Sequence, residues 1–152
     1  GHTLMASFIG DWRGFIDRPI VNVRVIYADT DAMGIVYHTN YIKWFEIGRT
    51  ELLRRCGIVH AEMAPLGFNL PVTRVYCHYL LPAQYDQVLT IFTRIAYIKR
   101  ASMKFVYEIL NSVTAQKMVE GYTVHACTDH RGRVVRLPAV LIERLHSEAA
   151  SV

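Results

Sequence analysis

One amphipathic segment, residues 40–56, restricts the architecture of this chain more than any other feature. Apolar or small residues recur along it at helical spacing, at Tyr41, Trp44, Phe45, Gly48, Leu52 and Cys56. Thr39 or Asn40 can cap the first turn of such a helix, and Gly57 can adopt the left-handed conformation that ends it. A helix with one apolar stripe is stable only when another element covers that stripe. The rest of the chain therefore has to supply a covering surface.

Strand-like segments on both sides of this helix supply that surface. Residues 20–27 are rich in β-branched side chains and run into the turn-forming stretch ADTDAMG. After the helix, short turns separate four more segments that favour strands, at residues 71–79, 88–98, 102–110 and 118–128. We also expect a short strand at 134–137 and a helix from Ala139. No helix alternates with these strands, so the order predicts an antiparallel sheet against one long helix and excludes a doubly wound fold.

The length and the composition favour a single domain. With 152 residues, of which 52% are hydrophobic and 20% charged, the chain can form one packed core. No repeat, linker or composition break lies between Pro19 and His146, so we predict one domain over residues 19–152. Residues 1–18 are expected to be an N-terminal extension, whose opening GHTLM resembles a tag remnant. No stretch has the ~18 apolar residues of a membrane span, and no signal peptide is predicted.

The net charge and the cysteine spacing limit the classes of ligand and the cellular locations that we expect for this chain. The net charge of +4 comes from 17 Lys and Arg against 13 Asp and Glu, a mild excess that is compatible with a small anionic ligand. No basic run is dense enough to indicate nucleic acid. Cys56, Cys77 and Cys127 are widely spaced and form no C-x-x-C pair, so neither a disulfide framework nor a zinc ribbon is indicated. We therefore expect a cytoplasmic location.

Motifs of other enzyme classes are incomplete or missing in this sequence. The D-x-D-x-x-G run at residues 29–34 resembles the start of a calcium-binding EF-hand loop, but Met33 and Asn40 stand where oxygen ligands belong. The H-A-E run at residues 60–62 resembles the opening of a zinc deaminase motif, but the P-C-x-x-C partner is missing. No metal site is therefore predicted. Without a G-x-S-x-G motif or a P-loop, a serine α/β-hydrolase and a nucleoside-triphosphate enzyme have no support.

The segment from the end of the first strand through the helix resembles the signature of a known protein family. The stretch YADTDAMGIVYHTNYIKWFEIGRTELLRRCGI, residues 27–58, resembles the signature of the 4-hydroxybenzoyl-CoA thioesterase family of hotdog-fold proteins, especially its branch of Tol-Pal-associated acyl-CoA thioesterases. The segments YDQVLTI (85–91), IKRAS (98–102) and GRVVRLP (132–138) fall where the family has counterparts, so the resemblance covers residues 20–146. It implies an α+β hotdog fold, with an antiparallel sheet of five or six strands wrapped around one long central helix. It also implies homodimers with a continuous sheet, which often form homotetramers.

The resemblance implies an enzyme that hydrolyses acyl-CoA thioesters. Asp31 falls on the family's catalytic carboxylate, and the backbone N–H of His38 falls on its oxyanion donor. A thiolate leaves readily, since thiols have a pKa of about 8.5, so one carboxylate can suffice as nucleophile or as base for water. Gly34 allows close approach of the backbone to the substrate, and Tyr41 is predicted to contact the substrate. Outside this match an Asp pair in a loop is most often an ordinary turn, and Asp29 is expected only to shape it.

Lys99 and Arg100 lie in a predicted turn between two strands. In the family a basic cluster at this turn contacts the phosphates of CoA, often on the neighbouring subunit, so the resemblance assigns them to substrate binding. Otherwise they form a solvated hairpin end, and Ala101 stands where relatives can have a third basic residue. The partners implied are acyl-CoA, acyl carrier protein and further copies of the chain. No cofactor is implied beyond the coenzyme A of the substrate.

Two other functions stay open at this point. One is a hotdog-fold hydratase or dehydratase, for which His38 and Asp31 could supply the acid and base. The other is a non-catalytic module that binds acyl-CoA or acyl carrier protein. Release of free thiol from acyl-CoA separates a thioesterase from both of these, and a change in the acyl chain separates a dehydratase from a binding module.

Overall fold

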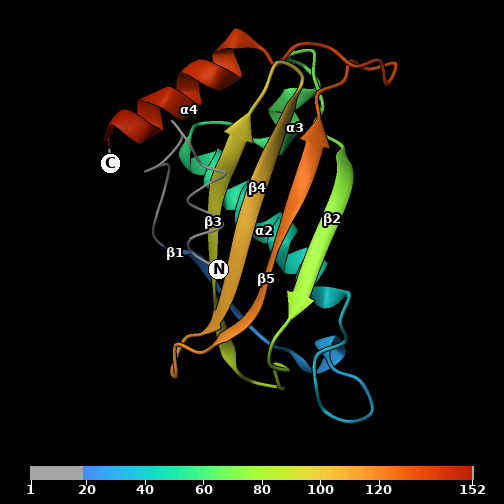
Figure 1. Ribbon diagram of the computed structural model, residues 1–152, viewed down its shortest axis with the longest axis vertical. Helices are drawn as coiled ribbons and strands as arrows, with labels where there is room; N and C mark the ends of the chain where they lie inside the picture. The colour runs from blue at the N-terminus through green and yellow to red at the C-terminus, as the bar shows by residue number, and fades with distance from the viewer. Residues whose placement is uncertain (1–18, 152) are drawn as a thin grey trace.

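Five antiparallel strands and one long helix dominate residues 19–151, the part of the chain that the computed structural model describes (Figure 1). The elements in chain order are β1 (Pro19–Arg24), η2 (Tyr27–Asp29), α2 (Asn40–Arg55), α3 (His60–Met63), β2 (Val72–Tyr79), β3 (Val88–Ile98), β4 (Ser102–Asn111), β5 (Lys117–Ala126) and α4 (Ala139–Ser151). The strands are hydrogen-bonded in the order β1-β3-β4-β5-β2. The predicted α+β fold is confirmed, with five strands in the sheet. The predicted N-terminal extension, residues 1–18, lies outside the described residues.

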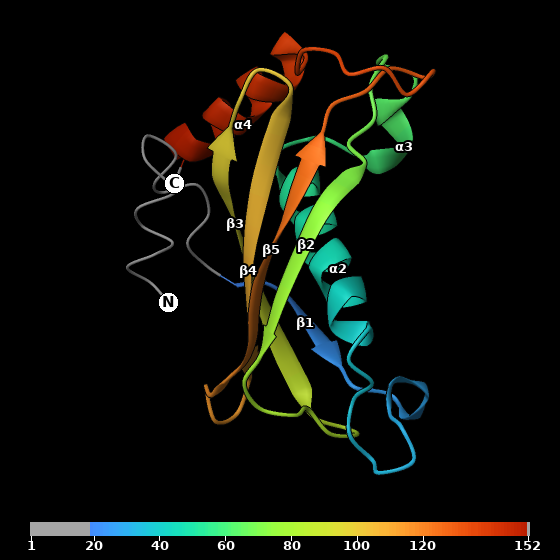
Figure 2. The ribbon, with the colours of Figure 1, turned by 45° about the vertical axis from the view of Figure 1, so that its right-hand side comes forward.

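Helix α2 lies against one face of the sheet (Figure 2), where it packs on β3, β1 and β4. Its buried residues are Tyr41, Trp44, Phe45, Gly48, Leu52 and Leu53. This is the predicted stripe, and Cys56 is buried directly after the last turn. Gly48 lets the helix approach β3 closely, because a Cβ there would overlap the side chains of Thr93 and Ile91. The predicted end of the helix is also confirmed, since Gly57 has a φ of +78°.

The first strand ends earlier than the sequence predicts. We expected a strand over residues 20–27, but β1 ends at Arg24 and a 3-10 turn begins at Tyr27. The Asp29 carboxylate explains this change, because its Oδ2 accepts a hydrogen bond from the backbone N–H of Ile26 (2.9 Å). This bond takes the N–H of Ile26 away from strand pairing, and the chain enters the turn that precedes α2.

The predicted strand at 134–137 is wrong. Within it Val134 makes a single bridge, to Thr128, and the next backbone hydrogen bonds go to two different segments, so the stretch has no single partner strand. The helix expected from Ala139 is confirmed as α4. Helix α3 was not predicted, because four residues are too few to show a helical period.

Candidate functional site

Asp31 lies in the turn between η2 and α2 and is exposed to solvent. Its Oδ1 accepts a hydrogen bond from the N–H of Met33 (2.8 Å), and its backbone carbonyl accepts one from Gly34 (3.0 Å). Gly34 has a φ of +80°, a conformation that favours glycine. Within residues 19–151 no donor contacts the other carboxylate oxygen, Oδ2. The turn therefore presents one free carboxylate oxygen from a hydrogen-bonded backbone.

The backbone N–H of His38 lies just before α2. In the described part of the chain this group donates no hydrogen bond, as is usual at the start of a helix, where the dipole also favours negative charge. The carbonyl of His38 accepts a hydrogen bond from the hydroxyl of Tyr79 (3.1 Å). The exposed imidazole lies beside the ring of Tyr37, with the ring centroids 4.6 Å apart. A free backbone donor therefore lies beside aromatic side chains.

A cavity of ≈ 230 Å³ opens beside His38. The start of α2, the end of β2 and the loop after β2 form its walls, with Val36, His38, Tyr41, Tyr79, Leu80, Leu81 and Pro82. The hydroxyl oxygen of Tyr41 accepts a hydrogen bond from the N–H of Ala83 (3.0 Å), and burial raises the pKa of Tyr41. The structure thus brings His38 and Tyr41 to one cavity, whereas Asp31 and Gly34 lie on the preceding turn and do not line it.

Asp29 is buried and does more than shape the turn. Its Oδ1 forms an ion pair with Nζ of Lys43 on α2 (2.7 Å), while its Oδ2 accepts the hydrogen bond from Ile26 (2.9 Å). Its carbonyl accepts a hydrogen bond from Nδ2 of Asn40 (2.8 Å). These contacts fasten the turn that carries Asp31 to the first part of α2. The ion pair joins residues 14 positions apart, and no motif indicated it.

The predicted capping of α2 is wrong in detail. Thr39 occupies the N-cap position, but its side chain makes no capping hydrogen bond. Asn40 uses its side-chain amide on the carbonyl of Asp29 instead. The N–H groups of Asn40, Tyr41 and Ile42 donate to the carbonyls of residues 37–39, so the donor that a ligand oxygen can use is the N–H of His38, just before the helix.

Lys99 and Arg100 are exposed on the hairpin between β3 and β4. This hairpin lies at the opposite end of the sheet from the turn before α2 (Figure 1). Nζ of Lys99 lies 4.5 Å from the centroid of the Tyr97 ring. Within one chain the structure does not bring the two basic residues to Asp31.

Two groups of large apolar side chains are uncovered. One follows the sheet edge formed by β2 and the loop after it, with Val72, Val75, Tyr76, Tyr79, Leu80 and Leu81. The other surrounds the turn before α2, with Ile26, Tyr27, Met33, Tyr37 and Tyr85. Unpaired strand edges and exposed apolar patches of this kind mark contact surfaces.

No helix in the described part of the chain is long and apolar enough to cross a membrane. Residues 19–151 also hold no group of three or more His, Cys, Asp or Glu side chains that could bind a metal ion.

Comparison with known proteins agrees with this fold. Residues 25–145 match the family model of the thioesterase-like superfamily. The chain is similar to the acyl-CoA thioester hydrolase YbgC of Escherichia coli O6:H1, with 36% identity over 90 residues that cover 59% of this chain and 67% of the relative. The acyl-CoA thioesterase YbgC of Haemophilus influenzae is 33% identical over 111 residues, 70% of this chain and 78% of the relative. The crystal structure of DHNA-CoA thioesterase from Staphylococcus aureus has a TM-score of 0.78 and 26% identity, and the match covers 86% of this chain and 89% of that chain.

Proposed function

This chain belongs to the thioesterase-like superfamily, and we propose that it hydrolyses acyl-CoA thioesters to a free acid and CoA. One observation carries the proposal: the turn before α2 presents a free carboxylate oxygen of Asp31 and, seven residues later, a free backbone N–H of His38. The similar proteins named acyl-CoA thioesterases support the substrate class.

The Asp31 carboxylate can act in two ways. It attacks the thioester carbon, so that an acyl anhydride forms and the C–S bond breaks, and water then hydrolyses the anhydride. In the other route it takes a proton from a water molecule, whose oxygen attacks the same carbon. In both routes the CoA thiolate leaves with the bonding electron pair and takes up a proton, and water supplies the new oxygen of the acid. Because a thiol has a pKa of about 8.5, the leaving group needs no further acid and the chemistry draws on no cofactor.

The N–H of His38 stabilises the negative charge that develops on the thioester oxygen. A backbone donor at a helix start is fixed before the reaction, and loss of one such donor in other enzymes lowers kcat by about 100- to 1000-fold. The ring of Tyr41 forms a wall for the substrate beside this donor. Gly34 keeps side-chain atoms away from the turn that carries Asp31.

We also propose that two copies of the chain pair through β2, as a homodimer or as half of a homotetramer. Antiparallel pairing would continue the sheet and cover the exposed edge of β2. A two-fold axis through the middle of β2 places Tyr79 of one chain beside Val72 of the partner subunit. It also places the partner's β3–β4 hairpin at the same end of the joint sheet as this chain's Asp31, so that Lys99 and Arg100 of the partner subunit can contact CoA phosphates. Light scattering at micromolar concentration checks this pairing, and a fully active monomer would contradict it.

Steady-state release of thiol from a panel of acyl-CoA substrates tests the function. A thioesterase releases thiol with turnover, a dehydratase changes the acyl chain without releasing thiol, and a binding module does neither. The panel includes 4-hydroxybenzoyl-CoA, because the signature over residues 27–58 supports membership of that family and of its Tol-Pal-associated branch. Acyl carrier protein thioesters form a second arm of the panel. The cytoplasmic location stays a prediction.

A further inference from the structure

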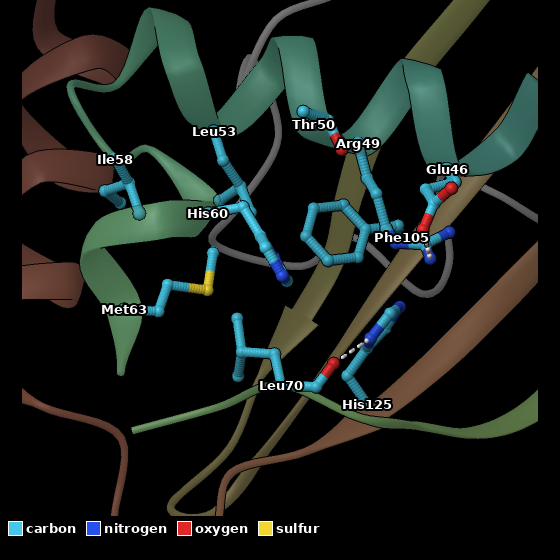
Figure 3. A pocket seen from close by; sticks show the side chains of 10 residues that line it. All are labelled: Glu46, Arg49, Thr50, Leu53, Ile58, His60, Met63, Leu70, Phe105 and His125. Atoms are coloured by element: carbon cyan, nitrogen blue, oxygen red, sulfur yellow. Dashed lines mark hydrogen bonds and ion pairs between the residues drawn. The ribbon is translucent and has the colours of Figure 1, made fainter. Parts of the chain in front are cut away.

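A second cavity lies farther along α2, between that helix, α3 and the sheet (Figure 3). Its volume of ≈ 70 Å³ exceeds the ~10–15 Å³ that one water molecule needs. The apolar part of its lining consists of Leu53, Ile58, Met63, Leu70 and Phe105. The polar part consists of Glu46, Arg49, Thr50, His60 and His125. The cavity can therefore hold a short carbon chain that ends in a polar group.

The guanidinium of Arg49 is the unsatisfied group in this lining. Its side chain is 16% exposed, and its Nη1 is buried with no hydrogen-bond partner among the described residues. Glu46 is a weak counter-charge, because its Oε1 lies 3.9 Å from Nη2 of Arg49 and its side chain is 67% exposed. A buried guanidinium nitrogen that lacks an acceptor is unfavourable, and an anionic group in the cavity would remove that penalty.

The polar groups on the sheet side of Arg49 bond to one another. The Tyr107 hydroxyl bonds to Oγ1 of Thr123 (2.6 Å), and that oxygen bonds to Nε2 of His125 (2.8 Å). Nδ1 of His125 lies 2.9 Å from the carbonyl oxygen of Leu70, to which it must donate. Burial lowers the pKa of His125 to about 4, so its ring is neutral and Nε2 accepts from Thr123. Arg49 already donates one hydrogen bond to Tyr107, but its Nη1 has no partner among the described residues, and its side chain lines the cavity (Figure 3).

We propose that this cavity binds a carboxylate at the far end of the acyl chain, so that the enzyme prefers CoA monothioesters of dicarboxylic acids. This inference rests on the proposed function. The planar guanidinium of Arg49 matches a carboxylate, and the apolar side of the cavity covers the carbons next to it.

The proposed pairing through β2 connects this cavity to a reactive turn. Leu70 of the cavity lining lies two residues before β2, and His125 is the register partner of Val72. The cavity thus lies near the beginning of β2, which the two-fold axis places beside the end of β2 in the second copy. An acyl chain held at one copy's Asp31 would then point toward Arg49 of the partner subunit.

Pairs of CoA thioesters with equal carbon number test the inference. Glutaryl-CoA is compared with pentanoyl-CoA, and adipyl-CoA with hexanoyl-CoA. In the wild type we expect kcat/KM to favour the dicarboxylic member by about 10- to 100-fold, the range of a charge-assisted hydrogen bond. In R49M this ratio should fall toward one. The control R54M removes an exposed arginine from the same helix outside the cavity and should keep the ratio.

Several outcomes would overturn the inference. They are an equal kcat/KM for both members of each pair in the wild type, and a preference that R49M retains. If R49M does not fold, R49Q removes the charge and keeps a polar side chain, and an unchanged ratio in R49Q counts against Arg49. If no thioester is hydrolysed at all, the proposed function fails, and calorimetry then compares the binding of glutaryl-CoA and pentanoyl-CoA. Tighter binding of glutaryl-CoA that R49M loses would support the cavity assignment, and equal binding would refute it.

Discussion

Two regions along α2 hold their polar groups in opposite ways. At the start of the helix, Asp31 is exposed and the backbone N–H of His38 has no partner within the described chain. In the second half of the helix, Arg49 lines a small cavity together with His125 of β5. The exposed region carries the groups that can react with a thioester, and the enclosed region can recognise only what is inserted into it. One chain therefore keeps the two regions at separate cavities along α2.

The two regions should also differ in whether a mutation affects activity or stability. An exposed carboxylate such as Asp31 contributes little to folding, so its removal should affect the reaction alone. A buried network such as that of His125 is costly to disturb, so its titration should affect folding first. The predictions below test this separation.

The largest effect is expected at the exposed end. Asp31→Asn should lower kcat by about 100-fold or more, because an amide neither attacks the thioester nor takes a proton from water. The fold should remain, since the Asn side-chain oxygen can still accept the hydrogen bond from Met33. Thiol release and thermal unfolding measure the two properties. Turnover above about a tenth of the wild-type value would refute the catalytic assignment of Asp31.

Around the enclosed cavity, a change of pH should alter the free energy of unfolding through the titration of His125. The pKa of His125 is about 4 in the folded chain against 6.5 for an ordinary histidine, so the unfolded chain binds more protons between these values. The free energy of unfolding should therefore fall as the pH falls from 6.5 to 4, by ~3 kcal/mol from this residue. Urea unfolding of wild type and His125→Gln across this range isolates the contribution of His125. An identical pH dependence in both proteins would contradict the neutral, buried histidine.

Replacement of Asp29 should affect both stability and activity, because this residue is buried and also fixes the turn that carries Asp31. Both of its carboxylate oxygens face donors, Lys43 and the N–H of Ile26, so the amide nitrogen in Asp29→Asn must face one of them. We expect a loss of ~1–3 kcal/mol in the free energy of unfolding, with reduced kcat. Asp86→Asn is the matched control: it removes an exposed carboxylate from an ion pair with Arg24 and should change stability by ~0.5 kcal/mol or less. Equal effects of the two variants would show that Asp29 only shapes the turn.

The fold was largely predictable, because burial patterns with periods of 3.6 and two residues are written directly in the sequence. The stripe from Tyr41 to Leu52 and the strand Val88–Ile98 follow these patterns. The false strand at 134–137 has the right residue types, but its backbone finds partners in two different segments. The strand preference of individual residues does not show whether their backbone groups will share one partner strand.

The candidate site was predictable only where a contiguous motif carries it. Asp31, Gly34 and His38 lie within eight residues, and the family signature includes all three. Arg49 and His125 meet at one cavity from positions far apart in the chain. No spacing rule joins such residues, and Arg49 reads in the sequence as one more charge on the polar face of a helix.

The smallest effect is expected at the basic hairpin, which belongs to neither region of α2. Replacing both Lys99 and Arg100 with Ala removes contacts remote from the reacting carbonyl, so the ground state and the transition state should lose the same binding energy. KM should rise by about 3- to 10-fold while kcat changes little, because exposed charge contacts contribute only a small part of the binding energy. The rise should shrink with added salt, because exposed charges are screened over about 8 Å at physiological ionic strength.

A thioester that carries only the pantetheine arm provides the control for the hairpin. It has no nucleotide phosphates, so the wild type and the double variant should hydrolyse it equally well. An equal loss of kcat on both substrates would mean that the hairpin supports the structure and does not bind CoA. Unchanged kinetics on full-length acyl-CoA would place the nucleotide elsewhere. A rise in KM confined to full-length acyl-CoA would instead indicate that the β3–β4 hairpin reaches the substrate held at the Asp31 of a second copy, since one chain keeps these groups at opposite ends of its sheet.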